Sequence, residues 1–160
     1  MWFNLLKTTH SVAPTVLRGM LGLVLFAHGA QKMLGWFGGY GFNGTMQYFT
    51  QTAHLPWLVA FLVILIEFVG AILMIAGAMV RPTAVAVIVL FLGIILSSHL
   101  SNGFFMNWFG SQKGEGYEYH LLVIAMAVSL FITGAGEYSV DGQIDSREHA
   151  ATGSEQSVRF

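Results

Sequence analysis

Residues 56–80 read PWLVAFLVILIEFVGAILMIAGAMV, and Glu67 is the one charged side chain in this run. Because an α-helix rises about 1.5 Å per residue, about 20 apolar residues cross the hydrocarbon core of a bilayer. The run is therefore long enough to span a membrane as a helix. Arg81-Pro82 follows it, and since proline restricts the residue before it, this pair predicts a tight hairpin.

Three further apolar runs cover residues 14–35, 83–100 and 117–133. The β-branched residues of the run 83–100 are ordinary for a helix in lipid, where every backbone polar group must be satisfied internally. We therefore expect an all-α membrane protein, an antiparallel four-helix transmembrane bundle with two long outer loops. A cleaved signal peptide is the alternative for the first run, but Arg18 interrupts it and His28 lies at position −3 of its small-residue site.

The composition agrees with a membrane protein and excludes several classes of function. Hydrophobic residues make up 55% of the chain and charged residues 9%, against about 25% charged residues in soluble domains. The net charge of −1 gives no basic surface for nucleic acid. Cysteine is absent, which excludes thiolate nucleophiles and Cys-ligated iron–sulfur or zinc sites. Redox chemistry would have to come from a cofactor or a partner subunit.

The basic residues predict the orientation of the chain in the membrane. One side carries five of them and the other two, as follows: Lys7, Arg18, Arg81, Arg147 and Arg159 against Lys32 and Lys113. The positive-inside rule then places both termini in the cytoplasm. We expect residues 1–141 to form the transmembrane domain and residues 142–160 a flexible polar cytoplasmic tail.

Two long connectors, about residues 36–55 and 101–116, would lie on the outer side and combine glycine with aromatic residues. Such aromatics are typical of a membrane-interface belt. A lid over a lipophilic ligand is the functional alternative. Residues 45–52 could form a short interfacial helix.

An ionisable residue inside a membrane span is costly and indicates a functional site by default. Glu67 lies near the middle of its span. His28, Gln31 and Lys32 share a helix face through their spacing of three and four residues. Three more polar residues would lie at a comparable outer depth on the last two spans: His99, Asn102 and Glu118. These positions predict a polar pocket in the outer half of the bundle.

Such a pocket suits a quinone head group, because proton donors, an apolar wall and access from lipid would all be present. Each polar residue also has a structural interpretation, such as snorkelling of Lys32 or helix capping by Glu118. A bis-histidine haem between His28 and His99, or a metal site that adds Glu67 and Glu118, is chemically allowed but has no other support. We expect no haem, iron–sulfur cluster or metal.

Several spaced motifs resemble the DoxX family of small bacterial and archaeal membrane proteins. They are Arg18-Gly19 with Phe26-Ala27-His28-Gly29-Ala30-Gln31-Lys32, Glu67-Phe68-Val69-Gly70, Asn102-Gly103-Phe104-Phe105, Gly116-Tyr117-Glu118-Tyr119, and the closing residues 134–141. The resemblance covers residues 14–141. It implies a membrane subunit linked with quinone or thiol redox complexes, and therefore a bacterial inner-membrane location.

The resulting hypothesis is a quinone-linked oxidoreductase subunit. His28, Lys32 and Glu67 are the candidate catalytic residues, and the candidate ligand-binding residues are Arg18, Gln31, His99, Asn102, Glu118 and Tyr119. Two alternatives stay open: a non-enzymatic anchor or scaffold of a redox complex, and a small transporter or proton pathway that uses Glu67. The expected partners are the lipid bilayer and a redox subunit. A homo-oligomer is left open, and no nucleic acid is expected.

Overall fold

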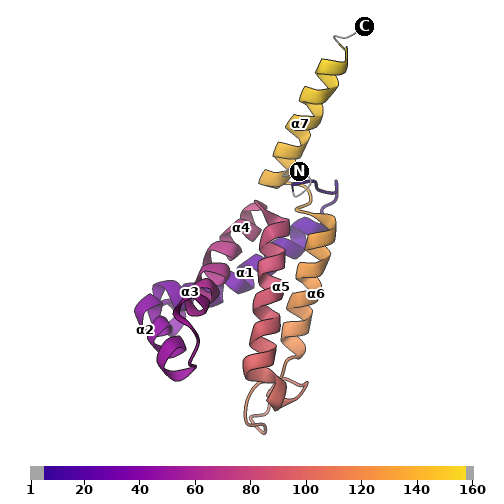
Figure 1. Cartoon of the computed structure of the whole chain (residues 1–160). Coiled ribbons are helices and arrows are strands. Elements are labelled where there is room, and N and C mark those ends of the chain that lie inside the picture. Colours follow the sequence, from indigo (N-terminus) through magenta and orange to yellow (C-terminus); the bar gives the residue numbers. More distant parts are fainter. Residues whose placement is uncertain (1–5, 158–160) are drawn as a thin grey trace.

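The computed structural model describes residues 6–157 of the chain and the side chains of residues 6–148. Every regular element in this range is helical (Figure 1), so the expected all-α fold class is confirmed. The elements are α1 (Ala13–Leu34), η2 (Trp36–Gly38), α2 (Gly41–Gln47), η3 (Tyr48–Thr52), α3 (Trp57–Leu65), η4 (Ile66–Gly70), α4 (Ala71–Ala76), α5 (Val80–Ile94), η5 (Ile95–His99), η6 (Leu100–Asn102), α6 (Glu118–Thr133) and α7 (Val140–Ser157). Arg159 lies outside the described residues.

Three helices in residues 6–157 are long and apolar enough to cross a membrane: Ala13–Leu34, Trp57–Ala76 and Val80–Asn102. The second comprises α3, η4 and α4, and the third comprises α5, η5 and η6. The fourth apolar helix, α6, has 16 residues, which is about 24 Å of helix against a hydrocarbon core of about 30 Å. A crossing by α6 remains a prediction.

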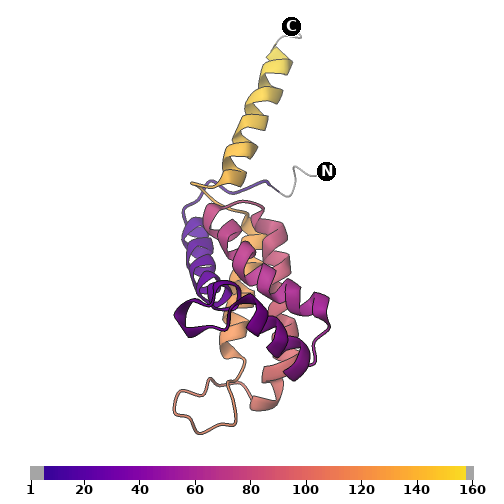
Figure 2. The same ribbon diagram turned by 90° about the vertical axis from the view of Figure 1, so that its left-hand side faces the viewer.

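The helices pack as two close pairs. α5 lies along α6, and α1 lies along η4 and α4 (Figures 1 and 2). Glycines make the second contact tight, because a Cβ added at Gly29 would lie 2.5 Å from the carbonyl oxygen of Glu67. Small residues of this kind let membrane helices approach closely. The contact brings the middle of the second span against the C-terminal half of α1.

The core is aliphatic, and the outer surface of the helices is apolar as well. Leu21, Leu25 and Leu130 are at most 1% exposed. Large apolar side chains such as Val89 and Ile132 are more than 60% exposed on the helix surfaces. A soluble monomer rarely shows so extensive an apolar surface, and lipid is the solvent that it suits.

The turn between α4 and α5 lies earlier in the chain than expected. Gly77 and Met79 adopt left-handed backbone conformations, with φ of 69° and 50°. Arg81 and Pro82 therefore lie in the first turn of α5, where a helix has no intrahelical partner for the N–H that proline lacks. The expectation that Arg81-Pro82 forms the hairpin is wrong by a few residues, because Gly77 rather than Pro82 ends the preceding helix.

A polar lock holds the end of the bundle next to this turn. The guanidinium of Arg18 is 3% exposed and donates to the carbonyl oxygens of Ala135, Met74, Ile75 and Tyr138 at 2.9, 3.1, 2.5 and 2.7 Å. These bonds satisfy carbonyls at the end of α4 and beyond α6, which the helices themselves leave free.

Asp141 completes the lock. Its carboxylate accepts the backbone N–H groups of Met79 at 2.8 Å and Val80 at 2.9 Å, at the start of α5. Burial raises the pKa of the Asp141 carboxyl above its ordinary value, while these two N–H groups and the charges of Arg18 and Arg81 act in the opposite direction. An acceptor at a helix N-terminus satisfies otherwise free donors.

Most of the segment 142–160, which was expected to be a flexible tail, is helical as far as residue 157. α7 runs from Val140 to Ser157 and extends away from the other helices, with the N-terminal segment beside its base (Figures 1 and 2). The flexibility and the cytoplasmic location of residues 142–160 remain predictions. The first connector also contains helices, α2 and η3, which include the segment 45–52 that was expected to be helical.

Candidate functional site

A polar cavity of about 230 Å³ lies among the helices. Its walls come from α1, η4, α5, η5 and α6, so distant parts of the sequence meet there. The lining residues are Leu25, His28, Lys32, Glu67, Phe91, Ile94, His99, Tyr119 and His120. Five of the nine candidate site residues from the sequence thus lie together in this polar cavity.

Lys32 and Glu67, which both line the cavity, form an ion pair through the Lys32 ammonium and one Glu67 carboxylate oxygen. The Glu67 side chain is 6% exposed and that of Lys32 is 23% exposed. A buried charge of this kind needs a partner, because the loss of its hydration is not otherwise compensated. Glu67 also lies in the π-helical turn η4, and single π-helical turns occur frequently at functional sites.

His28 lies one helical turn before Lys32 and lines the same cavity. The spacing of four residues predicted this shared face, and the prediction is correct for this pair. Gln31 lies elsewhere, because its side-chain amide donates to the carbonyl of Phe37 at 3.4 Å. A Cβ added at Gly39 would lie 2.2 Å from the carbonyl oxygen of Gln31, so the first connector packs directly on this part of α1.

Two histidines, from η5 and α6, contact each other where they line the cavity. The rings of His99 and His120 have centroids 4.3 Å apart, and His99 Nδ1 lies 2.7 Å from the carbonyl oxygen of Glu115. His120 is 7% exposed, and its Nδ1 has no hydrogen-bond partner among the described residues. Phe91 packs against His120 with ring centroids 5.6 Å apart.

Tyr119 adds a second polar atom without a partner. Its hydroxyl is buried and makes no hydrogen bond within the part of the chain that the structure describes. Buried polar groups in proteins are nearly always hydrogen-bonded, to protein, water or ligand. The Tyr119 hydroxyl and His120 Nδ1 therefore leave hydrogen-bonding capacity on residues that line one cavity.

Asn102 and Glu118 organise the second connector. The Asn102 amide donates to the carbonyl of Glu115 at 3.0 Å, and the Glu118 carboxylate accepts the N–H of Met106 at 3.0 Å. Glu118 thus bonds the connector rather than capping α6, which has no side-chain cap hydrogen bond. Arg18, the remaining candidate, lies in the polar lock and does not line the polar cavity.

His120 is the cavity residue that the sequence reasoning did not select. A histidine in the first turn of an apolar helix was the available signal. The residues proposed as an alternative metal site, His28, Glu67, His99 and Glu118, are not brought together as ligands. Within residues 6–148, no group of three or more His, Asp or Glu side chains is arranged to hold a metal ion.

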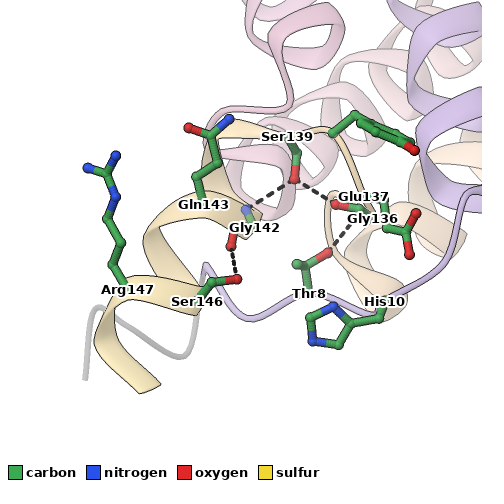
Figure 3. A pocket seen from close by; sticks show the side chains of 10 residues that line it. Thr8, His10, Gly136, Glu137, Ser139, Gly142, Gln143, Ser146 and Arg147 are labelled. Atoms are coloured by element: carbon green, nitrogen blue, oxygen red, sulfur yellow. Dashed lines mark hydrogen bonds between the residues drawn. The ribbon is translucent and has the colours of Figure 1, made fainter. Parts of the chain in front are cut away.

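A larger, open hollow of about 690 Å³ lies at the other end of the molecule, between the N-terminal segment and the start of α7 (Figure 3). Its polar groups bond to one another. The Ser139 hydroxyl donates to the Gly136 carbonyl at 2.6 Å and accepts the N–H of Gly142 at 3.0 Å, and Thr8 accepts the N–H of Gly136. In the smaller polar cavity, by contrast, two buried polar atoms, the Tyr119 hydroxyl and His120 Nδ1, have no hydrogen-bond partner among the described residues.

Comparison with known proteins identifies a family for the part of the chain that forms the three long apolar helices. The DoxX family model matches residues 13–100, from α1 to η6. A protein of Bacillus subtilis (strain 168) named "Putative oxidoreductase CatD" is 24% identical over 136 residues, which cover 85% of this chain and 90% of that protein. No solved structure matches this chain.

Proposed function

This chain belongs to the DoxX family of membrane proteins, and on that basis we propose that it is an inner-membrane oxidoreductase subunit that binds a quinone head group in the polar cavity. The name of the Bacillus subtilis relative supports the redox part of the proposal. The polar and apolar groups that line the cavity support a quinone as the ligand.

The proposal rests on one observation: the residues of a single cavity include a buried ion pair and two buried polar atoms that have no hydrogen-bond partner among the described residues. A quinone presents two carbonyl oxygens on opposite sides of a flat apolar ring. Lys32 lies on one wall of the cavity, and Tyr119 and His120 lie on another. Leu25 and Phe91 provide apolar surface between them. Ligand sites typically combine such apolar walls with a few convergent polar groups.

Reduction of a quinone to the hydroquinone consumes two electrons and two protons. The chain contains no cysteine, so in this proposal the electrons come from a redox cofactor carried by a partner subunit. Lys32 and the three histidines that line the cavity can donate or relay the protons. Glu67 holds the Lys32 ammonium in place.

Quinone binding tests the proposal directly. The protein is purified in mild detergent with added quinone, and the bound quinone is extracted and quantified by mass spectrometry. We expect the wild type to retain quinone and the variants His28→Ala and Glu67→Gln to lose it while remaining folded. Glu137→Gln is the control, because Glu137 does not line the polar cavity. Failure of the wild type to bind at saturating quinone would overturn the proposal.

A proton pathway is the second candidate, and the buried Lys32–Glu67 pair in a membrane span favours it. It predicts proton flux through vesicles that contain the purified chain, and loss of this flux in Glu67→Gln. A non-enzymatic scaffold predicts instead that the same variants disturb assembly with a partner and change neither quinone binding nor flux.

A further inference from the structure

An apolar groove lies next to the polar cavity, between the second and third spans. It has a volume of about 430 Å³, and its walls come from α3, η4, α5 and η5 with Leu55 of the preceding loop. Apart from Ser97, the lining residues are aliphatic or glycine. α3 leans away from α5, whereas α4 meets it (Figure 1), so the two helices that form the groove diverge from their junction.

The groove and the polar cavity share one wall residue, Ile94. They adjoin at two other positions, because Ile66 and Leu90 line the groove while their chain neighbours Glu67 and Phe91 line the cavity. A molecule that passes Ile94 would therefore reach from one space into the other.

Size and exposure indicate what occupies the two spaces together. The polar cavity alone, about 230 Å³, is smaller than the roughly 300–1,000 Å³ of typical ligand sites, and the adjoining groove brings the combined space into that range. Leu62 and Val89 line the groove and are 41% and 64% exposed. The groove therefore opens on the surface of the second and third spans, where lipid lies.

We propose that the groove holds the isoprenoid tail of the quinone whose head group occupies the polar cavity, and that this ligand enters sideways from the membrane past Ile94. The inference rests on the proposed function, and it adds where the tail of the quinone binds and how the quinone enters the protein. The class of ligand is a lipid-soluble quinone with an apolar tail, because the groove is lined by aliphatic side chains and glycine apart from Ser97.

Gly93 provides a test that leaves the fold intact. It lines the groove on α5, and a Cβ added there meets no atom within 4 Å. Gly93→Leu therefore adds a side chain that points its volume into a lining position of the groove, at a site where its Cβ has open space, and it replaces glycine within a helix by a better helix former. Gly19→Leu is the matched control, because Gly19 also lies within a helix, meets no atom within 4 Å, and does not line the groove.

Each variant is reconstituted in lipid nanodiscs, and the binding of menadione and of menaquinone-4 is measured. The two probes share the naphthoquinone head, and only menaquinone-4 has an isoprenoid tail. We expect Gly93→Leu to weaken menaquinone-4 binding by about tenfold, since the new side chain excludes the tail. Menadione binding to Gly93→Leu, and the binding of both probes to Gly19→Leu, should stay within about twofold of the wild type.

Three results would overturn the inference. Unchanged menaquinone-4 binding in Gly93→Leu would mean that the tail lies elsewhere. Equal weakening of both probes would mean that the substitution acts on the polar cavity itself. A change of oligomeric state in Gly93→Leu would assign the groove to a second copy of the chain. In the first and third cases menadione would still bind, and its binding to the wild type would leave the proposed function standing.

Discussion

Replacing Lys32 by methionine keeps most of the volume of the side chain and removes its charge. The Glu67 carboxylate would then lose its ion-pair partner at a site where its side chain is 6% exposed. Removing one partner of a buried ion pair lowers the free energy of unfolding by about 3–5 kcal/mol. We take the lower end, about 3 kcal/mol, because the 23% exposure of Lys32 shows that water reaches the pair from one side.

Glu67→Gln should cost less, about 1 kcal/mol, since the flexible Lys32 side chain can turn its ammonium toward the more polar surface. The double variant leaves no charge unpaired. Its free energy of unfolding should therefore be higher than that of Lys32→Met alone, although it carries one more substitution. This reversal of order separates a buried pair from two independent surface charges.

Thermal unfolding of the wild type, the two single variants and the double variant in the same detergent measures these differences in stability. For a chain of this size, about 3 kcal/mol corresponds to a Tm about 6–12 °C lower. Lys113→Met, in the exposed second connector, is the control and should leave the Tm unchanged. Equal losses for Lys32→Met and Glu67→Gln, or additive losses in the double variant, would refute the reasoning.

Three further predictions concern other parts of the molecule. His120→Phe should abolish quinone binding and leave the Tm within a few degrees, as measured by the extraction assay; retained quinone would contradict a ligand role for this ring. Because burial raises the pKa of Asp141 above its ordinary value of 3.8, the folded state binds more protons than the unfolded chain at pH values between the unfolded and the folded pKa. The free energy of unfolding should therefore fall as the pH rises above about 4, and Asp141→Asn should flatten this dependence in unfolding measured at several pH values. Since the chain lacks cysteine, a single cysteine at the exposed position Ser111 should react with an impermeant reagent from outside the cell; reaction of a cysteine at Ser154 from outside would reverse the orientation.

Sequence patterns predicted the parts of this protein that depend on neighbours within one helix. The first and fourth apolar runs agree with the observed helices α1 and α6 to within one residue, whereas the third helix begins three residues before its predicted run. The placement of His28 and Lys32 on one face was also predicted correctly. Both results follow from the fixed rise and period of a helix, which a single segment determines by itself.

Predictions that needed contacts between helices were less successful. Arg18 was a candidate ligand-binding residue because of its motif, but it bonds carbonyls at the ends of other helices. Pro82 was expected to mark the hairpin, but a left-handed Gly77 ends the preceding helix first. For Arg18, partners from other parts of the chain decided its contacts, and for Pro82, the left-handed conformation of Gly77 decided where the helix ends.

By itself, the sequence determined that this is an all-helical membrane protein of the DoxX type, with an acidic residue in its second span. Only the tertiary structure decided that Lys32 pairs with Glu67, that His120 faces His99, and that Ile94 separates a polar cavity from an apolar groove. The physical reason is that hydrophobic length and helical period are local properties of the chain. Which polar groups meet depends on how closely the helices pack, and at Gly29 that distance is set by the absence of a side chain.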